Sequence, residues 1–569
     1  MPHVITQSCC SDGSCVYSCP VNCIHPSPDE PGFADAEMLY IDPAACVDCG
    51  ACVTACPVGA IRPDSRLAPD QMPFIAVNGN HYPPRPAGVK LPPTSKLAPV
   101  LPAPRIRRRG LTVAVVGAGP AGIYAADELL TQDGVRVNVF DKLPTPYGLV
   151  RAGVAPDHQS TKSITRLFDR ISRTPGFSYY LNVEVGRHLS HAEVLAHHHA
   201  VIYAVGAPGD RRLDIDGMGM PGTGTATETV AWINGHPGFA ERTVDLSHHR
   251  VVIIGNGNVA LDVARILTVD PETLAGTDIS DSALAALRDS SVREAVVAAR
   301  RDPGDSAFTL PELIGLTATS EVVLDAGDHT LVHADLQTCR DPGVRAKLEI
   351  LAALGVAEQS GQPGQSDQPG QTGRSRIRLA YRLTPQRITG RGRAQGVTFT
   401  RTGTGDEVNL AAGLVLSSIG YRGARVADLP FDESAAVVPN EHGRVVDPAT
   451  GRPVTGAYVA GWIKRGPTGF IGTNKSCAMQ TVAALVDDFN AGLLDDPVGR
   501  PAALTGLIRD RQPDAVDAAG WQAIDAAEIA RGQVAGRPRV KFTTVGDMLT
   551  AATRRPTRLF SLPSRRKRA

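Results

Sequence analysis

Long apolar runs are missing from this sequence of 569 residues. No stretch holds 18 consecutive apolar residues, and the N-terminus lacks a basic flank followed by an apolar core. The first absence argues against a transmembrane helix and the second against a secretory signal peptide. We therefore expect a soluble cytoplasmic protein without a membrane or nucleic-acid partner, and the sequence gives no indication of its oligomeric state.

Cysteine is scarce beyond residue 56, and positive charge is missing from the first 60 residues. Nine of the eleven cysteines fall within residues 1–56, which in a cytosolic chain indicates metal binding rather than disulfides. Residues 1–60 hold seven acidic side chains and no Lys or Arg, so the remainder carries 58 basic against 51 acidic side chains, a formal charge of +7. We expect the acidic head and the basic body to attract each other and to dock for electron transfer.

Two related cysteine runs lie in this head. The second reads Cys46-x2-Cys49-x2-Cys52-x3-Cys56-Pro57 and matches the spacing of bacterial iron–sulfur proteins, in which the fourth cysteine binds the other cluster. Zinc knuckles also use C-x2-C pairs, but three evenly spaced cysteines and a Cys-Pro, in two related copies, favour iron–sulfur clusters. In the crossed pattern one cluster takes Cys46, Cys49, Cys52 and Cys19, and the other takes Cys56, Cys15 and one residue of the Cys9-Cys10 pair.

The head resembles ferredoxins, particularly the seven-iron type with one [3Fe-4S] and one [4Fe-4S] cluster. The first run departs from the two-cubane pattern because it lacks C-x2-C-x2-C. We favour a three-thiolate site of Cys9, Cys15 and Cys56, with Cys10 as an alternative fourth ligand that would complete a second [4Fe-4S] cluster. Cys23 matches a position that is commonly a free thiol in the family, so it is left out of the ligand set.

A glycine-rich turn after an apolar run, residues 113–116, is the feature around which the body is organised. Gly117 permits a tight turn, Gly119 lets a phosphate approach the backbone, and Gly122 lets the following helix pack closely on the strand. Glycines punctuate many strand-to-helix turns, but the next apolar run ends in Asp141, a carboxylate placed to accept the ribose hydroxyls. The turn, including Ala118, therefore predicts a bound dinucleotide.

A second turn of this kind follows apolar residues 251–254. It reads Gly255-Asn256-Gly257-Asn258-Val259-Ala260, so alanine replaces the third glycine. Two such turns predict two dinucleotides. The next apolar strand ends in Arg300 and Arg301, where an NAD site would place an acid, and arginine supplies planar donors for a 2′-phosphate. This favours NADP(H) over the alternative of two merely exposed arginines, with Arg212 as the next candidate.

The Pro- and Gly-rich loop of residues 144–158, together with the first glycine turn, resembles the adrenodoxin-reductase family of ferredoxin–NADP reductases over about residues 111–550. With the cysteine head, the chain resembles a two-domain ferredoxin/ferredoxin–NADP reductase fusion. The resemblance implies that the first dinucleotide is FAD and that Leu149 lies by the flavin. It also implies that Val185 meets the adenine and that the flavin is flanked by Trp462, Gly469, Phe470 and Ile471. His158 and Glu312 are the implied catalytic residues, and Gly315 stands where the family often has a second carboxylate.

The predicted fold class is α/β, with two Rossmann-like domains for FAD and NADP preceded by a small α+β ferredoxin-like domain. A Pro-rich tract is predicted to be an extended linker. The basic cluster of residues 105–109 is either solvated surface or a docking site for the head. The predicted boundaries are 1–61 for the head, 62–110 for the linker, 111–210 and 406–550 for the FAD domain, 211–405 for the NADP domain with a disordered insertion at 359–374, and 551–569 for a basic tail.

The function that follows is that of a ferredoxin–NADP+ reductase. NADPH would give hydride to FAD, and single electrons would pass through the iron–sulfur clusters to a ferredoxin or another one-electron acceptor protein, from which a cytochrome P450 could be fed. The reaction is reversible in principle. The alternatives are an NADPH-dependent electron-input subunit of a larger complex, resembling the small chain of glutamate synthase, and a non-enzymatic iron–sulfur sensor.

Overall fold

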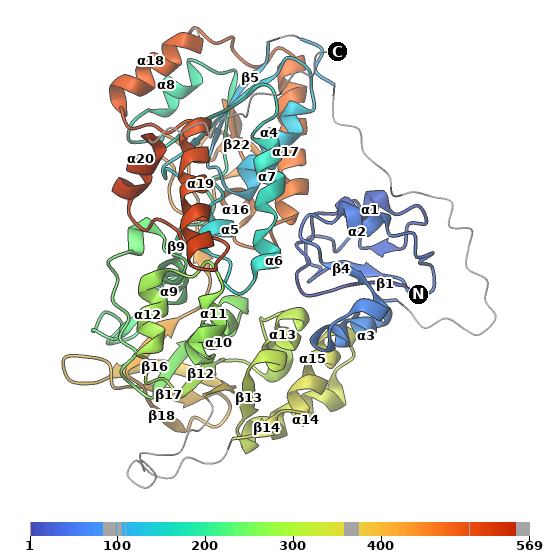
Figure 1. Ribbon diagram of the computed structural model, residues 1–569, viewed down its shortest axis with the longest axis vertical. Coiled ribbons are helices and arrows are strands. Elements are labelled where there is room, and N and C mark those ends of the chain that lie inside the picture. The colour runs from blue at the N-terminus through green and yellow to red at the C-terminus, as the bar shows by residue number, and fades with distance from the viewer. Residues whose placement is uncertain are drawn as a thin grey trace, which may run out of the picture.

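The computed structural model describes residues 2–82, 98, 105–108, 110–357, 375–499 and 501–553, and the structural statements below refer to these residues. A small head stands beside a larger body of two domains, which lie one above the other in Figure 1. The predicted insertion at 359–374 and the predicted basic tail beyond residue 553 fall outside the described part of the chain. No helix among the described residues is long and apolar enough to cross a bilayer.

The head is built from two copies of one strand–helix–strand unit. The second helix repeats the first at a shift of 37 residues, from 14–18 to 51–55. Each antiparallel pair joins one strand of the first copy to one strand of the second, so the two copies are interleaved. The elements are β1 (His3–Ile5) paired with β4 (Ile61–Pro63), β2 (Ile24–His25) paired with β3 (Tyr40–Ile41), and helices α1 (Ser14–Ser18) and α2 (Ala51–Ala55).

The prediction of an extended linker from residue 62 is wrong for residues 62–82, which are folded onto the head. They form the end of β4, the short 3-10 helices η1 (Asp64–Arg66) and η2 (Pro69–Gln71), and helix α3 (Pro73–Asn80). The side chain of Asn78 bonds the backbone of Ile5 and Ile41, and Phe74 is buried. Pro69 and Pro73 mislead as linker signals because proline also favours the first turn of a helix. Of the remaining predicted linker, residues 83–97 and 99–104 lie outside the described residues.

The first domain of the body has a seven-stranded sheet whose central strands are parallel and apolar, because helices cover both faces. In sheet order the strands are β21 (Asn440–Glu441), β22 (Arg444–Asp447), β23 (Arg452–Val459), β8 (Ala200–Tyr203), β5 (Thr112–Val116), β6 (Arg136–Asp141) and β7 (Phe177–Leu181). The helices are α4 (Pro120–Leu130), α5 (Leu149–Ala152), α6 (Gln159–Lys162), α7 (Thr165–Ile171), α8 (His191–Leu195), α16 (Trp462–Arg465), α17 (Thr473–Asn490), α18 (Pro501–Arg511), α19 (Ala518–Val534) and α20 (Val545–Thr553).

The second domain has its own seven-stranded parallel sheet, and β9 (Gly209–Asp210) with β20 (Tyr421–Arg422) connects the two domains. In sheet order the strands are β10 (Thr223–Thr225), β19 (Leu414–Ser417), β11 (Arg250–Ile254), β12 (Glu294–Ala298), β15 (Arg376–Ala380), β13 (Glu321–Leu324) and β14 (Gly355–Val356). An antiparallel sheet covers one side: β16 (Leu383–Thr389), β17 (Gly396–Arg401) and β18 (Glu407–Ala411). The helical elements are α9 (Ala226–Ile233), η3 (Pro237–Phe239), α10 (Asn258–Thr268), α11 (Pro271–Ala275), α12 (Asp281–Arg288), η4 (Pro303–Asp305), α13 (Leu310–Thr319), α14 (Ala326–Thr338) and α15 (Pro342–Ala352).

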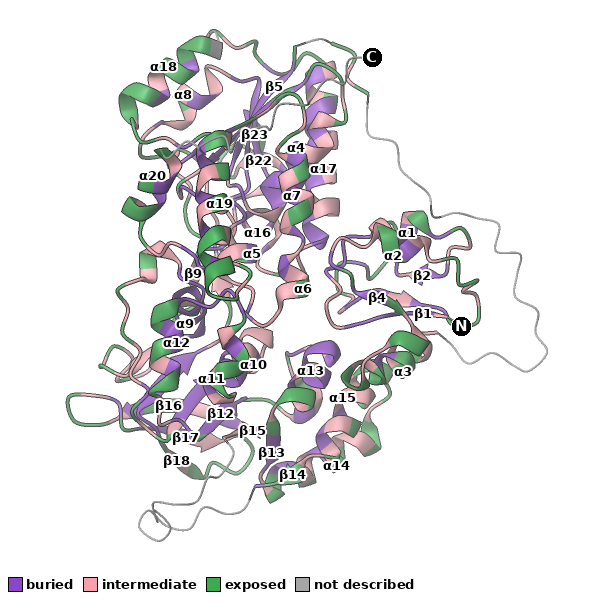
Figure 2. Ribbon diagram, in the orientation of Figure 1, coloured by how far each residue is buried: buried purple, intermediate pink, exposed green. Residues whose placement is uncertain are grey.

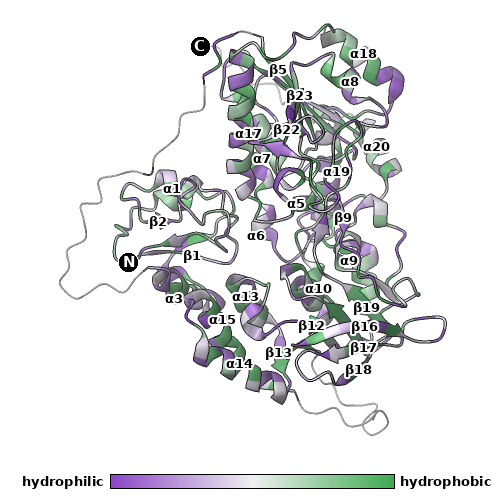
Figure 3. Ribbon diagram, turned by 180° about the vertical axis from the view of Figure 1, so that it is seen from behind, coloured by the Kyte–Doolittle hydropathy of each residue, from purple (hydrophilic) through white to green (hydrophobic). Residues whose placement is uncertain are grey.

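Each sheet is the centre of its own apolar core. Figure 2 shows the strands largely in the colour of buried residues and the outer helix faces in that of exposed ones, and Figure 3, from behind, shows hydrophobic residues concentrated on the sheets. Val115 and Val297 mark the two cores, with exposed fractions of 0% and 1%. The predicted α/β class with a small leading iron–sulfur-type domain is therefore confirmed.

The basic cluster of residues 105–109 does not contact the head through its described members. The backbone N–H of Arg107 donates to Oδ1 of Asn490, and the Arg108 guanidinium donates to the Phe489 carbonyl and lies 5.0 Å from the centroid of the Phe489 ring. Both partners are at the C-terminal end of α17, where a helix favours positive charge. Arg109 lies outside the described residues.

Candidate functional site

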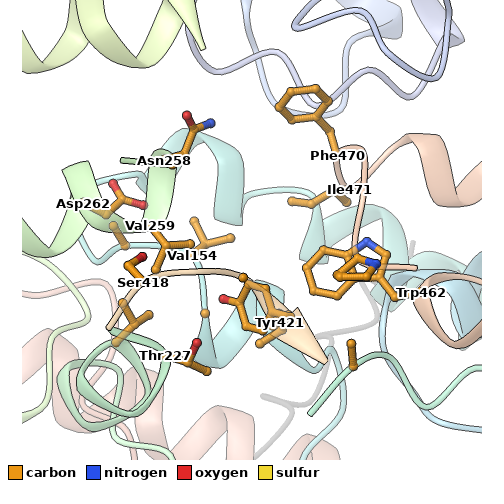
Figure 4. A pocket seen from close by; sticks show the side chains of 18 of the residues that line it. Val154, Thr227, Asn258, Val259, Asp262, Ser418, Tyr421, Trp462, Phe470 and Ile471 are labelled. Carbon is orange, nitrogen blue, oxygen red and sulfur yellow. The ribbon is translucent and has the colours of Figure 1, made fainter. Parts of the chain in front are cut away.

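A cavity of about 1370 Å³ lies between the two domains of the body, at the carboxyl ends of both parallel sheets. Figure 4 shows side chains from both domains pointing into it, among them Asn258 and Asp262 from the second domain and Trp462 and Ile471 from the first. Both glycine turns line this one cavity. The head also reaches it, through Gln7, Ser8 and Cys9.

The surroundings of the three glycines in the first turn explain why a side chain is absent at each, and they fit a dinucleotide site. Gly117 has a φ of +107°, and a Cβ there would lie 2.4 Å from the carbonyl oxygen of Ala204. A Cβ on Gly122 would lie 1.9 Å from the carbonyl oxygen of Gly117, which accounts for the close packing of helix on strand. A Cβ on Gly119 would meet nothing within 4 Å, so this glycine faces open space at the N-terminus of α4, where backbone N–H groups can bind a phosphate.

The second turn repeats these features. A Cβ on Gly255 would lie 2.2 Å from the carbonyl oxygen of Ser418, whereas one on Gly257 would meet nothing within 4 Å. The side chain of Asn258 accepts the N–H of Thr309 at 2.9 Å and so ties the turn to the start of α13. The structure therefore provides two turns of the type that binds a dinucleotide.

Most predicted cofactor residues line the cavity, and four do not. The lining includes Gly117, Gly119, Asp141, Leu149, Asn256, Gly257, Asn258, Val259, Arg300, Arg301, Glu312, Trp462, Gly469, Phe470, Ile471 and the predicted catalytic His158. Ala118 and Gly122 are buried behind the turn, and the Ala118 N–H fixes Asp141 by donating to its Oδ2 at 2.8 Å. Val185 and Arg212 do not line the cavity: Val185 packs on the core of the first domain, and Arg211 lines the cavity in place of Arg212.

The two predicted catalytic residues lie together around an arginine that the motifs did not indicate. Arg265, on α10 and only 3% exposed, donates to Oε1 of Glu312 at 2.9 Å and to Nε2 of His158 at 3.1 Å. It also pairs with Asp157 at 2.7 Å and with Asp262 at 2.5 Å. Within the sequence around Arg265, the feature that indicates an ion pair is Asp262, which stands one helical turn before the arginine.

Electrostatics in this cluster are set by burial and by that one positive charge. Burial, followed by the charge of Asp262, raises the pKa of the Glu312 carboxyl. Burial would also raise the pKa of Asp157, but the Arg265 charge and hydrogen bonds outweigh it and lower that pKa. His158, Asp262 and Glu312 offer ligand atoms within 4.8 Å of one another, yet Arg265 already supplies the compensating positive charge. The structure therefore shows three carboxylates and an imidazole gathered around one buried guanidinium.

The head contacts the second domain at α13, beside Glu312. Glu37 accepts the backbone N–H of Leu310 at 2.7 Å and pairs with Lys347 at 2.6 Å. Gln7 donates to Oε2 of Glu312 at 3.4 Å, and a Cβ on Gly315 would lie 2.2 Å from the Gln7 amide nitrogen. At Gly315, where the family often has a second carboxylate, the Gln7 side chain of the head thus takes up the space.

The head also contacts the first domain at the start of α17. The Gly472 N–H donates to the carbonyl oxygen of Cys10 at 2.7 Å, and a Cβ on Gly472 would lie 2.2 Å from the backbone nitrogen of Asp12. Lys475 donates to the hydroxyl of Ser14 at 3.3 Å. The head therefore bridges the two domains at the cavity. Among the contacts just described, the Glu37–Lys347 ion pair has the signs of charge that the sequence predicted.

The cysteines form two groups that fit the predicted cluster sites. The predicted ligands Cys19, Cys46, Cys49 and Cys52 line one small pocket together with Cys23. The backbone N–H of Cys23 donates to the sulfur of Cys19, and in the other copy the backbone N–H of Ala60 donates to the sulfur of Cys56. Because alanine makes the same backbone contact, the position that Cys23 and Ala60 share does not need a side chain that binds metal. Near Cys9, burial raises the thiol pKa to about 11, so without a metal to replace its proton this sulfur would stay neutral. Cys9 and Cys56 both pack against the apolar cluster of the head that contains Cys15.

Two family models match the chain. One, described as pyridine nucleotide-disulphide oxidoreductase, matches residues 111–377 and covers both glycine turns. The other, a 4Fe-4S binding domain, matches residues 39–62 and covers the second cysteine run. The matches assign these two parts of the chain to known types of domain.

Whole-chain relatives extend this result. A Mycobacterium tuberculosis protein named "Probable ferredoxin/ferredoxin--NADP reductase" is 69% identical over 558 residues, which are 98% of this chain and 96% of the relative. The Mycobacterium leprae protein named "NADPH-ferredoxin reductase FprA" is 39% identical and aligns with 77% of this chain and 97% of its own length. The solved structure of Mycobacterium tuberculosis FprA in complex with NADPH has a TM-score of 0.69 and 37% identity and covers 78% of this chain and 100% of its own.

The fold, the cavity and the cysteine sites define an oxidoreductase with two dinucleotide-binding domains and an iron–sulfur head. The chain belongs to the ferredoxin/ferredoxin–NADP reductase family, and its body is similar to the FprA reductases. The family resemblance predicted from the motifs is therefore confirmed.

Proposed function

We propose that the protein is an NADPH-dependent ferredoxin reductase that exchanges single electrons with a ferredoxin-type or haem-protein partner, from which a cytochrome P450 could be supplied. The observation that carries the proposal is that Cys9 of the head lines the same cavity as Gly119 and Gly257. One cavity thus joins two dinucleotide turns with a cysteine site. The names of the relatives agree with this reading.

The cofactors proposed are FAD at the first turn, NADP(H) at the second, and two iron–sulfur clusters in the head. When bound, they would supply hydride transfer and its conversion into one-electron transfer, which no side chain can carry out. Asp141, which lines the cavity, is proposed to bind the ribose of the first dinucleotide. Arg300 and Arg301 are proposed to bind the 2′-phosphate of the second, because both are exposed at the cavity wall just after β12.

His158 and Glu312 are proposed to handle protons at the nicotinamide end of the cavity. The guanidinium of Arg265 donates to Nε2 of His158, and Nδ1 of the same ring lies 4.0 Å from Oδ1 of Asp262. Arg265 also orients Glu312. The chain thereby brings the His158 imidazole and a carboxyl whose pKa is raised by burial to the same guanidinium, an arrangement suited to proton transfer.

The proposal is tested by counting iron, sulfide and flavin on protein purified without air and then titrating it with NADPH and NADH. We expect about one FAD and two clusters per chain, and bleaching of the flavin at far lower NADPH than NADH. A protein without flavin, or one that responds equally to both nucleotides, would contradict it. Copurification with a larger enzyme would favour the electron-input subunit instead.

A further inference from the structure

Gln7 belongs to a turn of the head whose backbone is fixed. The N–H of Cys9 donates to the carbonyl oxygen of Thr6 at 3.1 Å, which closes the turn over residues 6–9. Thr6 is buried, and both its backbone N–H and its hydroxyl donate to the carbonyl oxygen of Ala60, at 2.9 and 3.0 Å. Backbone contacts therefore set the position of Gln7 in the head, and its side chain contacts the body.

The amide of Gln7 and the guanidinium of Arg265 bond different oxygens of Glu312. The Gln7 nitrogen donates to Oε2 at 3.4 Å, and Arg265 donates to Oε1 at 2.9 Å. The first bond is long, as hydrogen bonds at catalytic groups often are before a substrate binds. Glu312 is 7% exposed, so water has little access to either oxygen. The carboxylate is therefore held by the second domain at one oxygen and by the head at the other.

The body leaves room for this amide at Gly315, one turn of α13 after Glu312. A Cβ on Gly315 would lie 2.2 Å from the nitrogen and 2.4 Å from the oxygen of the Gln7 amide. Any side chain at residue 315 would take the space in which the amide lies. The contact between Gln7 and Glu312 therefore depends on a glycine at this position.

Helix α13 is shared between the head and the second domain. Leu310 and Ile314 are buried in the apolar core of the head. Glu37 of the head also accepts the Leu310 N–H at 2.7 Å. Glu312, which stands between these two apolar residues in the sequence, bonds Arg265 of the second domain. The contact with Gln7 therefore lies within a larger interface and is not an isolated surface contact.

A primary amide suits a carboxyl group that gains and loses a proton. Its NH₂ group donates to the ionised form, and after rotation of the amide its oxygen accepts from the protonated form. The bond to the ionised form is the stronger of the two because it involves a charge. An apolar side chain at residue 7 would leave Oε2 of Glu312 without this partner, and the loss would be greater for the ionised form.

The charged and titratable groups described around Glu312 come from two segments of the body and from the head. They are Arg265 and Asp262 on α10, His158 and Asp157 from the loop before α6, and Glu37 from the head. Burial, followed by the charge of Asp262, raises the pKa of Glu312, whereas the charges of His158 and Arg265 lower it. All of these groups remain when residue 7 is substituted, so a change in the protonation of Glu312 would report the loss of the amide.

We propose that Gln7 of the head is a positioning residue for the site in the body: its amide holds Oε2 of Glu312 while Arg265 holds Oε1. This rests on the proposed function, in which Glu312 handles protons. The same turn of the head carries Cys9, a proposed cluster ligand, two residues after Gln7. The head is thereby part of the proton-transfer site as well as the carrier of the cysteine sites.

The test follows the protonation of Glu312 by infrared titration of the full-length protein with its cofactors. The carbonyl band of the protonated carboxyl is assigned by its loss in Glu312→Gln. Gln7→Met keeps the length of the side chain and removes the amide. We expect the proton affinity of Glu312 to rise about tenfold in this variant, so that the band persists to higher pH. Gln533→Met, at an exposed position of α19, is the matched control and should leave the titration unchanged.

Gly315→Ala tests the same contact from the body, because its Cβ displaces the amide without a change in the head. The band should shift in the same direction as in Gln7→Met, and the double variant should shift no further, since both changes remove one contact. A titration of Gln7→Met equal to that of the parent would overturn the proposal, as would additive shifts in the double variant. If Gln7→Met does not retain its clusters, Gly315→Ala decides alone, and an unchanged titration there overturns the proposal.

The rate at which NADPH reduces the flavin separates this inference from the proposed function. If Glu312 handles protons, the pH dependence of this rate should move with the infrared midpoint in Gln7→Met and Gly315→Ala. A pH dependence that is the same in Glu312→Gln and in the parent would contradict the role of Glu312 in the proposed function. The infrared shift would still show whether Gln7 holds the carboxylate.

Discussion

Gly472 and Cys10 join the body to the head through a hydrogen bond of 2.7 Å between the glycine N–H and the cysteine carbonyl oxygen. The contact requires glycine, because a Cβ at this position would lie 2.2 Å from the backbone nitrogen of Asp12. At the second domain Gly315 leaves room for Gln7, but there a Cβ would meet only the amide end of the Gln7 side chain, at 2.2 Å from its nitrogen. The head is therefore seated in a shaped site that spans both domains, with its first cysteine group toward the cavity.

Substituting Gly472 by Ala should loosen the head. Since the colliding atoms are backbone, the loop must shift, and overpacking of this kind costs about 1–3 kcal/mol. Amides in residues 9–14 should then exchange about 5- to 150-fold faster in hydrogen-exchange mass spectrometry. Gly506→Ala is the matched control, because a Cβ there meets nothing within 4 Å. Unchanged exchange at residues 9–14 would show that this contact does not hold the head.

Arg300 and Arg301 should determine the preference for NADPH. A charged hydrogen bond contributes about 1.5–3 kcal/mol, which corresponds to an effect of about 10- to 150-fold for each arginine that makes one. In Arg300→Ala and Arg301→Ala, kcat/KM for NADPH should fall by that factor while kcat/KM for NADH barely changes, because NADH has no 2′-phosphate. Arg212→Ala should change neither value, since Arg212 does not line the cavity. Equal losses with both nucleotides would assign the arginines to a shared phosphate or to the fold.

The parts of the site that the sequence could predict are those encoded within a short segment. Gly117, Gly119 and Gly122 have roles set by a single turn. The predicted reasons agree with the collisions a Cβ would make at Gly117 and Gly122 and with the open space beside Gly119. The second cysteine run is similarly local. The basic pair Arg300 and Arg301 follows its strand directly, so its place at the cavity wall also follows from order along the chain.

What the sequence could not predict depends on contacts between distant segments. Arg265 becomes central only because Asp157 and Glu312 approach it from other elements. The folding of residues 62–82 depends on Asn78 reaching β1 and β3, which no local pattern indicates.

Replacing Arg265 by Met should destabilise the protein strongly and in a pH-dependent way. The change leaves the buried Glu312 and the half-buried Asp157 and Asp262 without the cation they share, and breaking a buried pair costs about 3–5 kcal/mol. In the parent the pKa of Asp157 is lowered, so its contribution to stability is present above its unfolded pKa and is lost as pH falls through the folded value.

The deficit in the free energy of unfolding should therefore be large at pH 8 and smaller at pH 5, where the carboxyl groups of the variant can take up protons. Urea titrations at both pH values measure it. Arg288→Met, which breaks the exposed pair with Glu272, should change the free energy of unfolding far less than Arg265→Met at both pH values, because water and salt screen that pair. A deficit that is independent of pH would mean that Arg265 acts through packing and not through charge.

The last prediction concerns the buried group that joins the two domains behind the cavity. Asp278 of the second domain accepts Nζ of Lys162 of the first domain at 2.7 Å and lies 2.8 Å from Nζ of Lys541, which follows α19. Lys541 also donates to the carbonyl oxygen of Arg151 at 3.1 Å. Both lysines are buried, and burial lowers their pKa values, most strongly for Lys541.

Asp278→Asn should separate the domains more easily, because it leaves two buried ammonium groups without a carboxylate and costs about 3–5 kcal/mol. Without Asp278 the lysine pKa values fall further, so below about pH 10 the unfolded chain binds more protons than the folded one and stability rises with pH. The loss in the free energy of unfolding, measured by urea titration, should therefore be larger at pH 7 than at pH 9. The exposed control Asp289→Asn should change stability by less than about 0.5 kcal/mol at either pH. A loss no greater than that of the control would show that the lysines are already neutral and that Asp278 does not hold the domains together through charge.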